Sequence, residues 1–506
     1  MNIKQAKQEI QNTLRAYLTR DELGNYLIPA IRQRPVLLMG PPGIGKTQIM
    51  AQIAAETGVG LVAYTITHHT RQSAIGLPFI EHRTYGDREF AVTEYTMSEI
   101  LASVYELMEK TGLREGILFL DEINCVSETL APMMLQFLQC KTFGNQALPE
   151  GWLIVAAGNP PEYNKSVRDF DVVTLDRVKR IDVQEDFAVW KEYARRNGIH
   201  GAVISYLDIK KDHFYAMETT VDGLQFATAR GWEDLSEIIL AYEKLGLQVG
   251  RDVVGQYIQL PRIAKDFANY LELYYKYQRI YHVEDILQGT WQQVTMLELR
   301  AAPFDEKLSV MGLVLSRLAE ESKKLRLQDQ HTITLHKTLL QFREDQRDCP
   351  PCQVLDGYIT RRQNAMKLAR DAGQQDRDSR NLAVRELQAL QTYRSRLVDE
   401  DIADSDAFEA VKDWFGKEVE LRRTMAEQVS AMFDHSFRFL EETFAQGQEL
   451  VMFVTEVTAG YDTSWFVENF GCEAYYRHNK ELFFDVGQSR IREHIAAVRN
   501  GAAEAE

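Results

Sequence analysis

A glycine-rich run near the start of the chain has the spacing of a phosphate-binding loop. It reads Gly40-Pro41-Pro42-Gly43-Ile44-Gly45-Lys46-Thr47 and fits the pattern G-x-x-x-x-G-K-[ST]. Its glycines permit backbone geometries that point N–H groups at an anion, and the helix expected over 48–57 adds the positive end of its dipole. We expect Lys46 to contact the β- and γ-phosphates of a nucleotide and the Thr47 hydroxyl to contact Mg²⁺. The sequence therefore predicts a site for ATP and Mg²⁺.

Two adjacent carboxylates end a second apolar run, 117–120, and are Asp121 and Glu122. The carboxyl ends of buried parallel strands lie at the edge where α/β sheets bind ligands. There Asp121 can hold the Mg²⁺ shell, and Glu122 can polarise an attacking water as a general base. A strand that ends in a solvated acidic turn is the alternative, and the presence of the phosphate loop favours the catalytic interpretation.

Three further polar residues lie downstream, each next to an apolar or helical segment. Asn159 follows the apolar run 153–157 and can orient the attacking water or contact the γ-phosphate. Arg177 in Leu175-Asp176-Arg177 and Arg230 before Gly231-Trp232 carry fork-shaped cations, which neutralise the charge that phosphoryl oxygens develop in the transition state. Taken alone, each arginine is equally well explained as a surface ion-pair residue, and a turn asparagine before a proline is common.

The pattern of apolar residues predicts the elements that position these side chains. Four continuous apolar runs occur at 36–39, 61–66, 117–120 and 153–157. Continuous runs are typical of strands that are covered on both faces, as in a parallel sheet between helices. We therefore predict a three-layer α/β core with a parallel sheet over residues 1–185.

Helical periodicity dominates the remainder of the chain. Residues 186–290 predict a small all-helical domain that glycines punctuate, and residues 291–506 predict a glycine-poor helical bundle. A stripe of Met and Phe side chains over 425–444 favours an ordinary bundle core over a ligand site.

Composition limits the class of protein. A length of 506 residues predicts two to four domains, and 45% hydrophobic with 26% charged residues is ordinary for a globular chain. The net charge of −16 disfavours nucleic acid as a partner, because chains that bind phosphate backbones normally carry the opposite sign. Five cysteines are few for this length, which favours reduced thiols. With no apolar run of about 20 residues, we predict a cytoplasmic protein without a membrane segment.

One cysteine pair has the spacing of a metal or redox motif, Cys349-Pro350-Pro351-Cys352. A structural zinc needs two more ligands, and the chain has no second Cys pair. A thioredoxin-like role needs a strand before the motif, whereas the preceding segment is helical and charged. We predict a rigid loop with two free thiols; metal and redox roles remain the alternatives.

The order of these motifs resembles that of the AAA+ ATPases, and most closely that of the MoxR-like group within the clade that carries an insert in the second helix. The resemblance rests on the phosphate loop, the Asp-Glu strand, the Asn strand, Leu-Asp-Arg and the Arg-Gly-Trp helix start, and covers about residues 20–290. Residues 72–78 look like the family segment after the second strand, and residues 79–93 would then be the inserted hairpin.

The resemblance implies a role for each of the later residues. Asn159 matches the first sensor, Arg177 matches the arginine finger that reaches a neighbouring subunit's ATP, and Arg230 matches the second sensor in a helical lid. Arg168 and Arg180 lie close enough to Arg177 to remain alternatives for the finger.

The resemblance also implies an assembly and a class of function. Its members form rings, commonly hexamers, and frequently have a partner protein with a von Willebrand factor A domain. They remodel or mature other proteins or metal centres, so we expect residues 291–506 to bind the partner or client. Two alternatives are a nucleic-acid-directed NTPase motor, which the low basicity disfavours, and a nucleotide-dependent assembly scaffold, which Glu122 disfavours.

Overall fold

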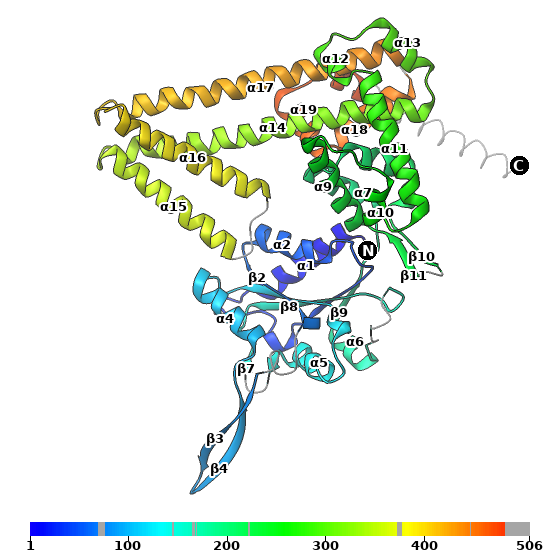
Figure 1. Cartoon of the computed structure of the whole chain (residues 1–506). Helices are drawn as coiled ribbons and strands as arrows, with labels where there is room; N and C mark the ends of the chain where they lie inside the picture. The colour runs from blue at the N-terminus through cyan, green and yellow to red at the C-terminus, as the bar shows by residue number, and fades with distance from the viewer. Residues whose placement is uncertain are drawn as a thin grey trace, which may run out of the picture. The chain divides into compact units, whose positions relative to one another are not determined.

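The computed structural model of the chain describes most of residues 1–480 (Figure 1). Within that range the residues outside the description are 69–75, 144–145, 164–166, 168–169, 221–222, 372–376 and 446. The chain divides into two compact units, of which the first contains residues 1–189 and 355–391. The second unit contains residues 190–354 and the chain from 392 onward.

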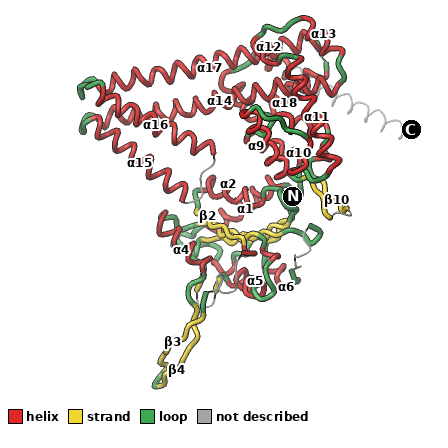
Figure 2. Tube along the Cα trace, in the orientation of Figure 1, coloured by secondary structure: helices red, strands yellow, loops and turns green. Residues whose placement is uncertain are grey.

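A five-stranded parallel sheet forms the centre of the first unit (Figure 2). Its strand order is β2-β5-β8-β1-β9. The strands are β1 Val36–Met39, β2 Gly60–Thr65, β5 Gly116–Asp121, β8 Trp152–Gly158 and β9 Lys179–Asp182. The four apolar runs of the sequence become four of these strands, and β1, β5 and β8 are buried almost throughout. The predicted α/β core with a parallel sheet is confirmed.

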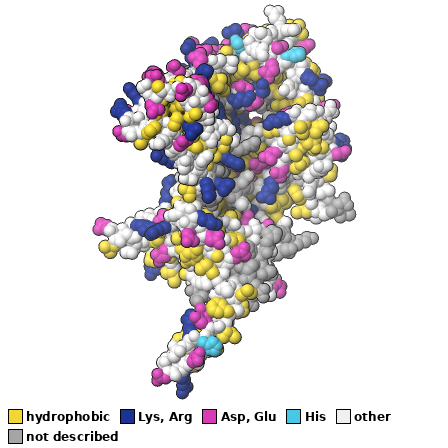
Figure 3. Space-filling view, turned by 60° about the vertical axis from the view of Figure 1, so that its left-hand side comes forward, with side chains coloured by type: hydrophobic (Ala, Val, Ile, Leu, Met, Phe, Trp, Pro, Cys, Tyr) yellow, Lys and Arg dark blue, Asp and Glu magenta, His cyan; other side chains and the backbone are white. Residues whose placement is uncertain are grey.

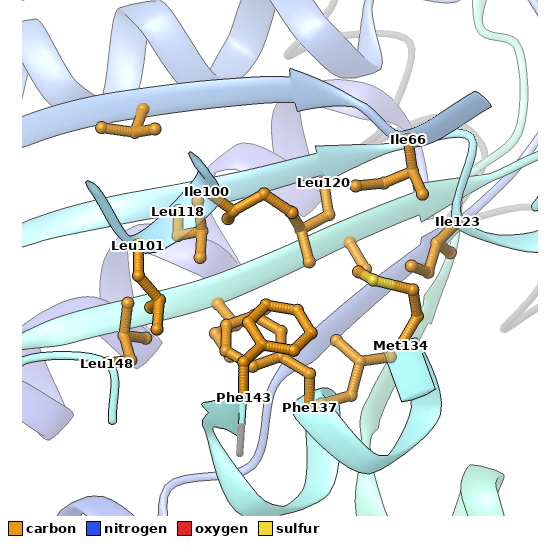
Figure 4. Close-up of a cluster of buried hydrophobic side chains, with 14 of the residues drawn as sticks. Ile66, Ile100, Leu101, Leu118, Leu120, Ile123, Met134, Phe137, Phe143 and Leu148 are labelled. Carbon is orange, nitrogen blue, oxygen red and sulfur yellow. The ribbon is translucent and has the colours of Figure 1, made fainter. Parts of the chain in front are cut away.

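Helices cover both faces of this sheet. They are α1 Ile3–Leu18, α2 Lys46–Thr57, α4 Glu99–Thr111, α5 Ala131–Cys140 and α6 Val172–Arg177. Apolar side chains of α1 and α2 pack with alternate residues of β1, such as Val36 and Leu38. On the other face, Leu118 and Leu120 of β5 pack with side chains from α4 and α5, including Phe137 (Figure 4). Burial on both faces explains why these strands are continuously apolar.

A two-stranded antiparallel hairpin branches from the core of the first unit. Its strands are β3 Pro78–Tyr85 and β4 Arg88–Tyr95, which agrees with the inserted hairpin predicted at 79–93. Both of its faces are largely exposed, including Ile80 at 71%. Charged side chains of both signs lie along it (Figure 3). Residues 72–75 of the preceding family-like segment lie outside the described residues.

The second unit begins with a mainly helical region. Its elements include α7 Phe187–Asn197, α8 Gly201–Ile209, α9 Ala229–Leu245, α10 Arg251–Tyr257, α11 Pro261–Ile280, α12 Val283–Gln288 and α13 Gln293–Ala301. A short antiparallel hairpin, β10 Ala216–Thr220 with β11 Gly223–Ala227, precedes α9. The sequence analysis did not predict this hairpin, because its strands are short and half-exposed and lack a run of apolar residues.

Long helices follow, which confirms the predicted all-helical C-terminal region. They are α14 Phe304–Asp345, α15 Pro351–Asp371, α16 Arg377–Asp399, α17 Ala407–Phe444, α18 Gln448–Ala459 and α19 Tyr461–Phe470. The 42 residues of α14 correspond to about 60 Å at 1.5 Å per residue. In the second unit α14 packs along α17 and against α19. Within the described residues, none of these helices combines the length and apolarity needed to cross a membrane.

The regions predicted as separate domains, 186–290 and 291–506, contact each other within the second unit. The Lys191 ammonium in α7 lies 3.0 Å from the Glu456 carboxylate in α18. The His435 ring in α17 bonds the Leu287 carbonyl at 2.8 Å, and a Cβ atom at Gly289 would lie 2.8 Å from that ring. The helices on both sides of residue 290 are therefore joined by polar contacts as well as by packing.

Candidate active site

The loop between β1 and α2 is shaped by its glycines. Gly43 and Gly45 have φ angles of 75° and 92°, which only glycine adopts without strain. A Cβ atom at Gly40 would lie 2.6 Å from the Val183 carbonyl oxygen, so this position also excludes a side chain. The loop ends directly at the first turn of α2, where backbone N–H groups have no partner within the helix. These features fit a cradle for phosphate.

Lys46 joins this loop to the end of β8. Its ammonium donates to the carbonyl oxygens of Gly40 and Pro41 at 2.8 Å and to Asn159 Oδ1 at 2.8 Å. The residue is buried, with 8% of its surface exposed. The contact with Asn159 brings together two residues that are 113 positions apart in the chain.

Thr47 and Asp121 form a pair of oxygen ligands at the end of β5. The Thr47 hydroxyl donates to Asp121 Oδ2 at 2.7 Å. Mg²⁺ prefers oxygen ligands and is usually held by one or two carboxylates with the substrate's phosphates and water. A site of this kind needs no larger cluster, and among the described residues no three His, Cys, Asp or Glu side chains form one. The pair fits the predicted Mg²⁺.

Glu122 follows Asp121 in a left-handed backbone conformation, with φ of 57°. Such a conformation costs a non-glycine residue about 1 kcal/mol or more and is often found at functional sites. The Glu122 N–H donates to Asp121 Oδ1 at 2.9 Å, and Glu122 Oε2 accepts from the Thr67 hydroxyl at 3.0 Å. Thr67 lies in the turn after β2 and was not identified from the sequence.

Asn159 follows β8 and contacts two other residues at this edge. Its Oδ1 accepts from Lys46, and its backbone carbonyl accepts from Asn124 Nδ2 at 2.8 Å. Asn124 is a second residue that sequence reasoning missed. The signal for it was a polar side chain within the otherwise apolar run Ile123-Asn124-Cys125-Val126.

Five predicted residues thus meet at the carboxyl end of the sheet. We call them the sheet-edge cluster: Lys46, Thr47, Asp121, Glu122 and Asn159.

The predicted arginines that the structure describes are not members of the sheet-edge cluster. Arg177 ends α6, is exposed, and its guanidinium donates to the Gln139 side chain in α5. Arg180 lies in β9 and pairs with Asp182 at 2.8 Å. Arg230 is exposed in the first turn of α9, in the second unit. Arg168 lies outside the described residues.

The two cysteines with motif spacing lie at the start of α15. Cys349 precedes the helix and Cys352 is in its first turn, and both are free thiols. Cys472 is buried, and burial raises the pKa of its thiol.

A comparison with family models identifies the part of the chain that carries this site. Residues 35–178 match the AAA domain of the dynein-related subfamily. This segment is an AAA-family ATPase domain. The match runs from β1 to α6, so the AAA domain contains the whole sheet-edge cluster and Arg177.

A search of solved structures finds similarity to two bacterial proteins. A mutant of RuvB from Thermotoga maritima is 14% identical, with 51% of this chain and 70% of that chain covered and a TM-score of 0.28. NtrX from Brucella abortus, in complex with ADP, is 16% identical, with 47% and 49% covered and a TM-score of 0.26. No curated protein sequence matches the chain. At these scores the neighbours support no statement about function.

Proposed function

We propose that the chain is an ATP-hydrolysing AAA+ ring motor of the MoxR-like group, which remodels or matures a partner protein or complex. The observation that carries the proposal is the sheet-edge cluster, whose residues come from the ends of two neighbouring parallel strands, β5 and β8, and from the first turn of α2. Phosphoryl transfer requires a phosphate chain, a metal and a water to be held side by side. The cluster supplies a suitable residue type for each of the three.

The glycine loop and the first turn of α2 would hold the nucleotide. Lys46 would bind the β- and γ-phosphates, because its present partners are neutral oxygens that a charged oxygen can replace. Thr47 and Asp121 would hold Mg²⁺, which when bound neutralises part of the phosphate charge.

Glu122 would act as the general base and Asn159 would orient the water. A general base must point its carboxylate at the water, and the hydrogen bond that Glu122 Oε2 accepts from the Thr67 hydroxyl orients this carboxylate. Asn159 is held between Lys46 and Asn124, so its amide has a defined direction at the site.

The ring and its partner belong to the same proposal. Arg177 would complete the pocket of a neighbouring subunit, with Arg180 or Arg168 as alternatives, and Arg230 would contact the nucleotide from the second unit. Hexamers are common in the MoxR-like group, and a protein with a von Willebrand factor A domain is the proposed partner. The exposed position of Arg177 at the end of α6 is compatible with reaching another subunit.

Two substitutions in the sheet-edge cluster separate binding from turnover. Lys46→Ala removes the cation at the phosphates, so tight ATP binding measured by calorimetry should be lost. Glu122→Gln keeps shape but not basicity, so ATP should still bind while hydrolysis falls by roughly 10²–10⁴-fold. Wild-type affinity in the first variant, or a wild-type rate in the second, would contradict the proposal.

A mixing experiment tests whether catalysis is shared between subunits. Rings of Arg177→Ala alone and of Glu122→Gln alone should both be inactive, because a trans arginine is worth roughly 10³–10⁵ in rate in related enzymes. In a cyclic head-to-tail ring mixed at random, roughly one interface in four would contain both groups, so ATP hydrolysis should reappear. Mixed rings that stay inactive would exclude Arg177 as the finger, and the same test applied to Arg180→Ala checks the alternative.

A further inference from the structure

Asn124 is a buried polar residue between the two groups proposed to act on water. It lies in the turn directly after Glu122 and is 3% exposed. Its Nδ2 donates to the backbone carbonyl of Asn159 at 2.8 Å. The neighbouring residues of this turn, Ile123 and Val126, are buried and apolar, as expected for a packing position. An amide at this place therefore needs its own explanation.

The Asn124 amide is only half satisfied. Its Oδ1 atom is buried and has no hydrogen-bond partner in the part of the chain that the structure describes. A buried acceptor without a donor is unfavourable, so a residue needed only for packing would be more stable as an apolar side chain of the same size. Buried groups left unsatisfied in this way are uncommon and point to a role other than stability.

The strand opposite Asn124 leaves room for this amide. A Cβ atom at Gly158 would lie 2.6 Å from Asn124 Oδ1 and 2.9 Å from its Cγ. Gly158 is the last residue of β8 and directly precedes Asn159. The amide therefore packs closely against the backbone that carries Asn159.

A chain of two hydrogen bonds connects the proposed base to the proposed sensor. The Cys125 N–H donates to the Glu122 carbonyl at 2.9 Å and closes the turn that contains Asn124. Asn124 Nδ2 then donates to the backbone carbonyl of Asn159. The turn that holds Glu122 and the strand end that holds Asn159 are tied together by this one side chain.

We propose that Asn124 is a positioning residue, which fixes the Glu122 turn relative to Asn159 for ATP hydrolysis. The inference rests on the proposed function, since it assigns Glu122 and Asn159 to the hydrolytic step. A displacement of about 1 Å between catalytic groups can cost 10²-fold in rate while leaving binding intact. The hydrogen bond of Asn124 goes to the backbone that carries Asn159 and not to the glycine loop or Thr47, so its loss should affect turnover more than affinity.

Two variants of the full-length protein test this role. Asn124→Asp keeps the shape but replaces the donor with an acceptor that faces the Asn159 carbonyl. Asn124→Leu keeps the volume and removes both the bond and the unsatisfied acceptor. For each, kcat should fall about 10- to 100-fold, while KM and the calorimetric affinity for ATP stay within about threefold. The Leu variant should melt within a few degrees of the wild type, because it loses one hydrogen bond and one unsatisfied group together.

Matched controls distinguish the failure of this inference from that of the proposed function. Asn12→Asp changes an exposed asparagine in α1 and should leave kcat unchanged. If Glu122→Gln is inactive while both Asn124 variants turn over at the wild-type rate, only the role of Asn124 is overturned. A wild-type rate in Glu122→Gln overturns the proposed base, and with it the positioning role. Failure of both Asn124 variants to fold would also overturn the inference, since it would make the residue structural.

Discussion

Lys46 in the AAA domain and Arg326 in the middle of α14 are both buried cations, with 8% and 6% of their surfaces exposed. The Lys46 ammonium donates to two backbone carbonyls and one amide oxygen, which are neutral acceptors. The Arg326 guanidinium pairs at 2.6 Å with the carboxylate of Asp462 in α19, whose side chain is only 3% exposed.

The charge of the partner decides whether the contact can be exchanged. A phosphate oxygen can replace a neutral acceptor of Lys46 without leaving any charge unpaired. If Arg326 left Asp462, a buried carboxylate would lose the guanidinium that pairs with it, which is strongly unfavourable. We therefore expect Lys46 to change partners when nucleotide binds and Arg326 to keep its partner in every state.

Other polar contacts support a fixed arrangement of the helices in the second unit. Asp329 in α14 pairs with Arg422 in α17 at 2.5 Å, and Gln328 bonds Glu418 at 2.7 Å. Gln328 and Asp329 follow Arg326 closely in α14. Their contacts join α14 to α17, the helix along which α14 packs. A row of such pairs can set the register of two long helices, because a shift by one turn would separate every pair.

The largest expected effect comes from breaking the buried pair. Arg326→Ala removes the guanidinium that pairs with the buried Asp462 carboxylate, so the free energy of unfolding of the second unit should fall by about 3–5 kcal/mol. Urea denaturation followed by circular dichroism measures this change. The exposed pair Arg423–Glu427 in α17 provides the control, since its side chains are 70% and 67% exposed. Arg423→Ala should leave the midpoint of the urea transition essentially unchanged.

A double variant sharpens the same test. Arg326→Met combined with Asp462→Leu removes both charges together, so most of the lost stability should return. If the double variant is as unstable as Arg326→Ala, the lower free energy of unfolding comes from altered packing of the side chains and not from the broken charge pair.

This contrast also explains which residues could be predicted from the sequence. The sheet-edge cluster follows continuous apolar runs or a glycine pattern, so position along the chain alone indicates that Lys46, Asp121 and Asn159 share one edge. The prediction of four of the five sheet strands rested on the same apolar runs. The fifth, β9, lies at the border of the sheet, contains a single apolar residue, Ile181, and was not predicted.

The remaining contacts could not be predicted, because they join residues that are distant in the chain and fit no motif. Arg326 and Asp462 are 136 positions apart, and helical periodicity cannot indicate that a charged residue faces the interior. The stripe predicted over 425–444 does supply core residues, among them Phe433 and Phe437. Thr67 and Asn124 act on the backbone or side chain of other site residues, and no spacing rule identifies such residues.

Lys141 is a third buried cation, and its hydrogen bond to a neutral partner is long. Lys141 follows α5, is 8% exposed, and its ammonium lies 3.4 Å from Gln33 Oε1. Burial lowers the pKa of Lys141 to about 8, from an ordinary value of about 10.4. Below pH 8 the folded protein must hold a poorly paired charge, and between pH 8 and 10.4 the unfolded chain binds more protons, so stability rises with pH in that window.

Lys141→Met should therefore stabilise the first unit at pH 7, by on the order of 2 kcal/mol. The gain should shrink as the pH rises above 8 and be nearly lost above pH 10.4, where the lysine is mostly neutral in both states of the wild type. Thermal denaturation at a series of pH values measures it. Lys110→Met is the control, because that side chain is 63% exposed, and its effect on stability should not follow this pH dependence.

The smallest expected effect on stability comes from Lys46, and it is the most direct test of exchangeable partners. Lys46→Met keeps the buried alkyl chain and removes the ammonium, so the neutral oxygens of Gly40, Pro41 and Asn159 lose a donor but no charge is left unpaired. Without nucleotide, the loss of these three hydrogen bonds is offset by removal of a buried charge, so the free energy of unfolding should change by less than about 2 kcal/mol. With ATP at about 100 times its Kd, the wild type should gain about 2.7 kcal/mol from binding, and the variant should gain almost none. Thermal denaturation of both proteins, with and without Mg-ATP, measures the change in stability and the stabilisation by nucleotide. A loss of 3 kcal/mol or more without nucleotide would place Lys46 with Arg326 as a fixed structural cation, and the proposed exchange of oxygen for phosphate would then be wrong.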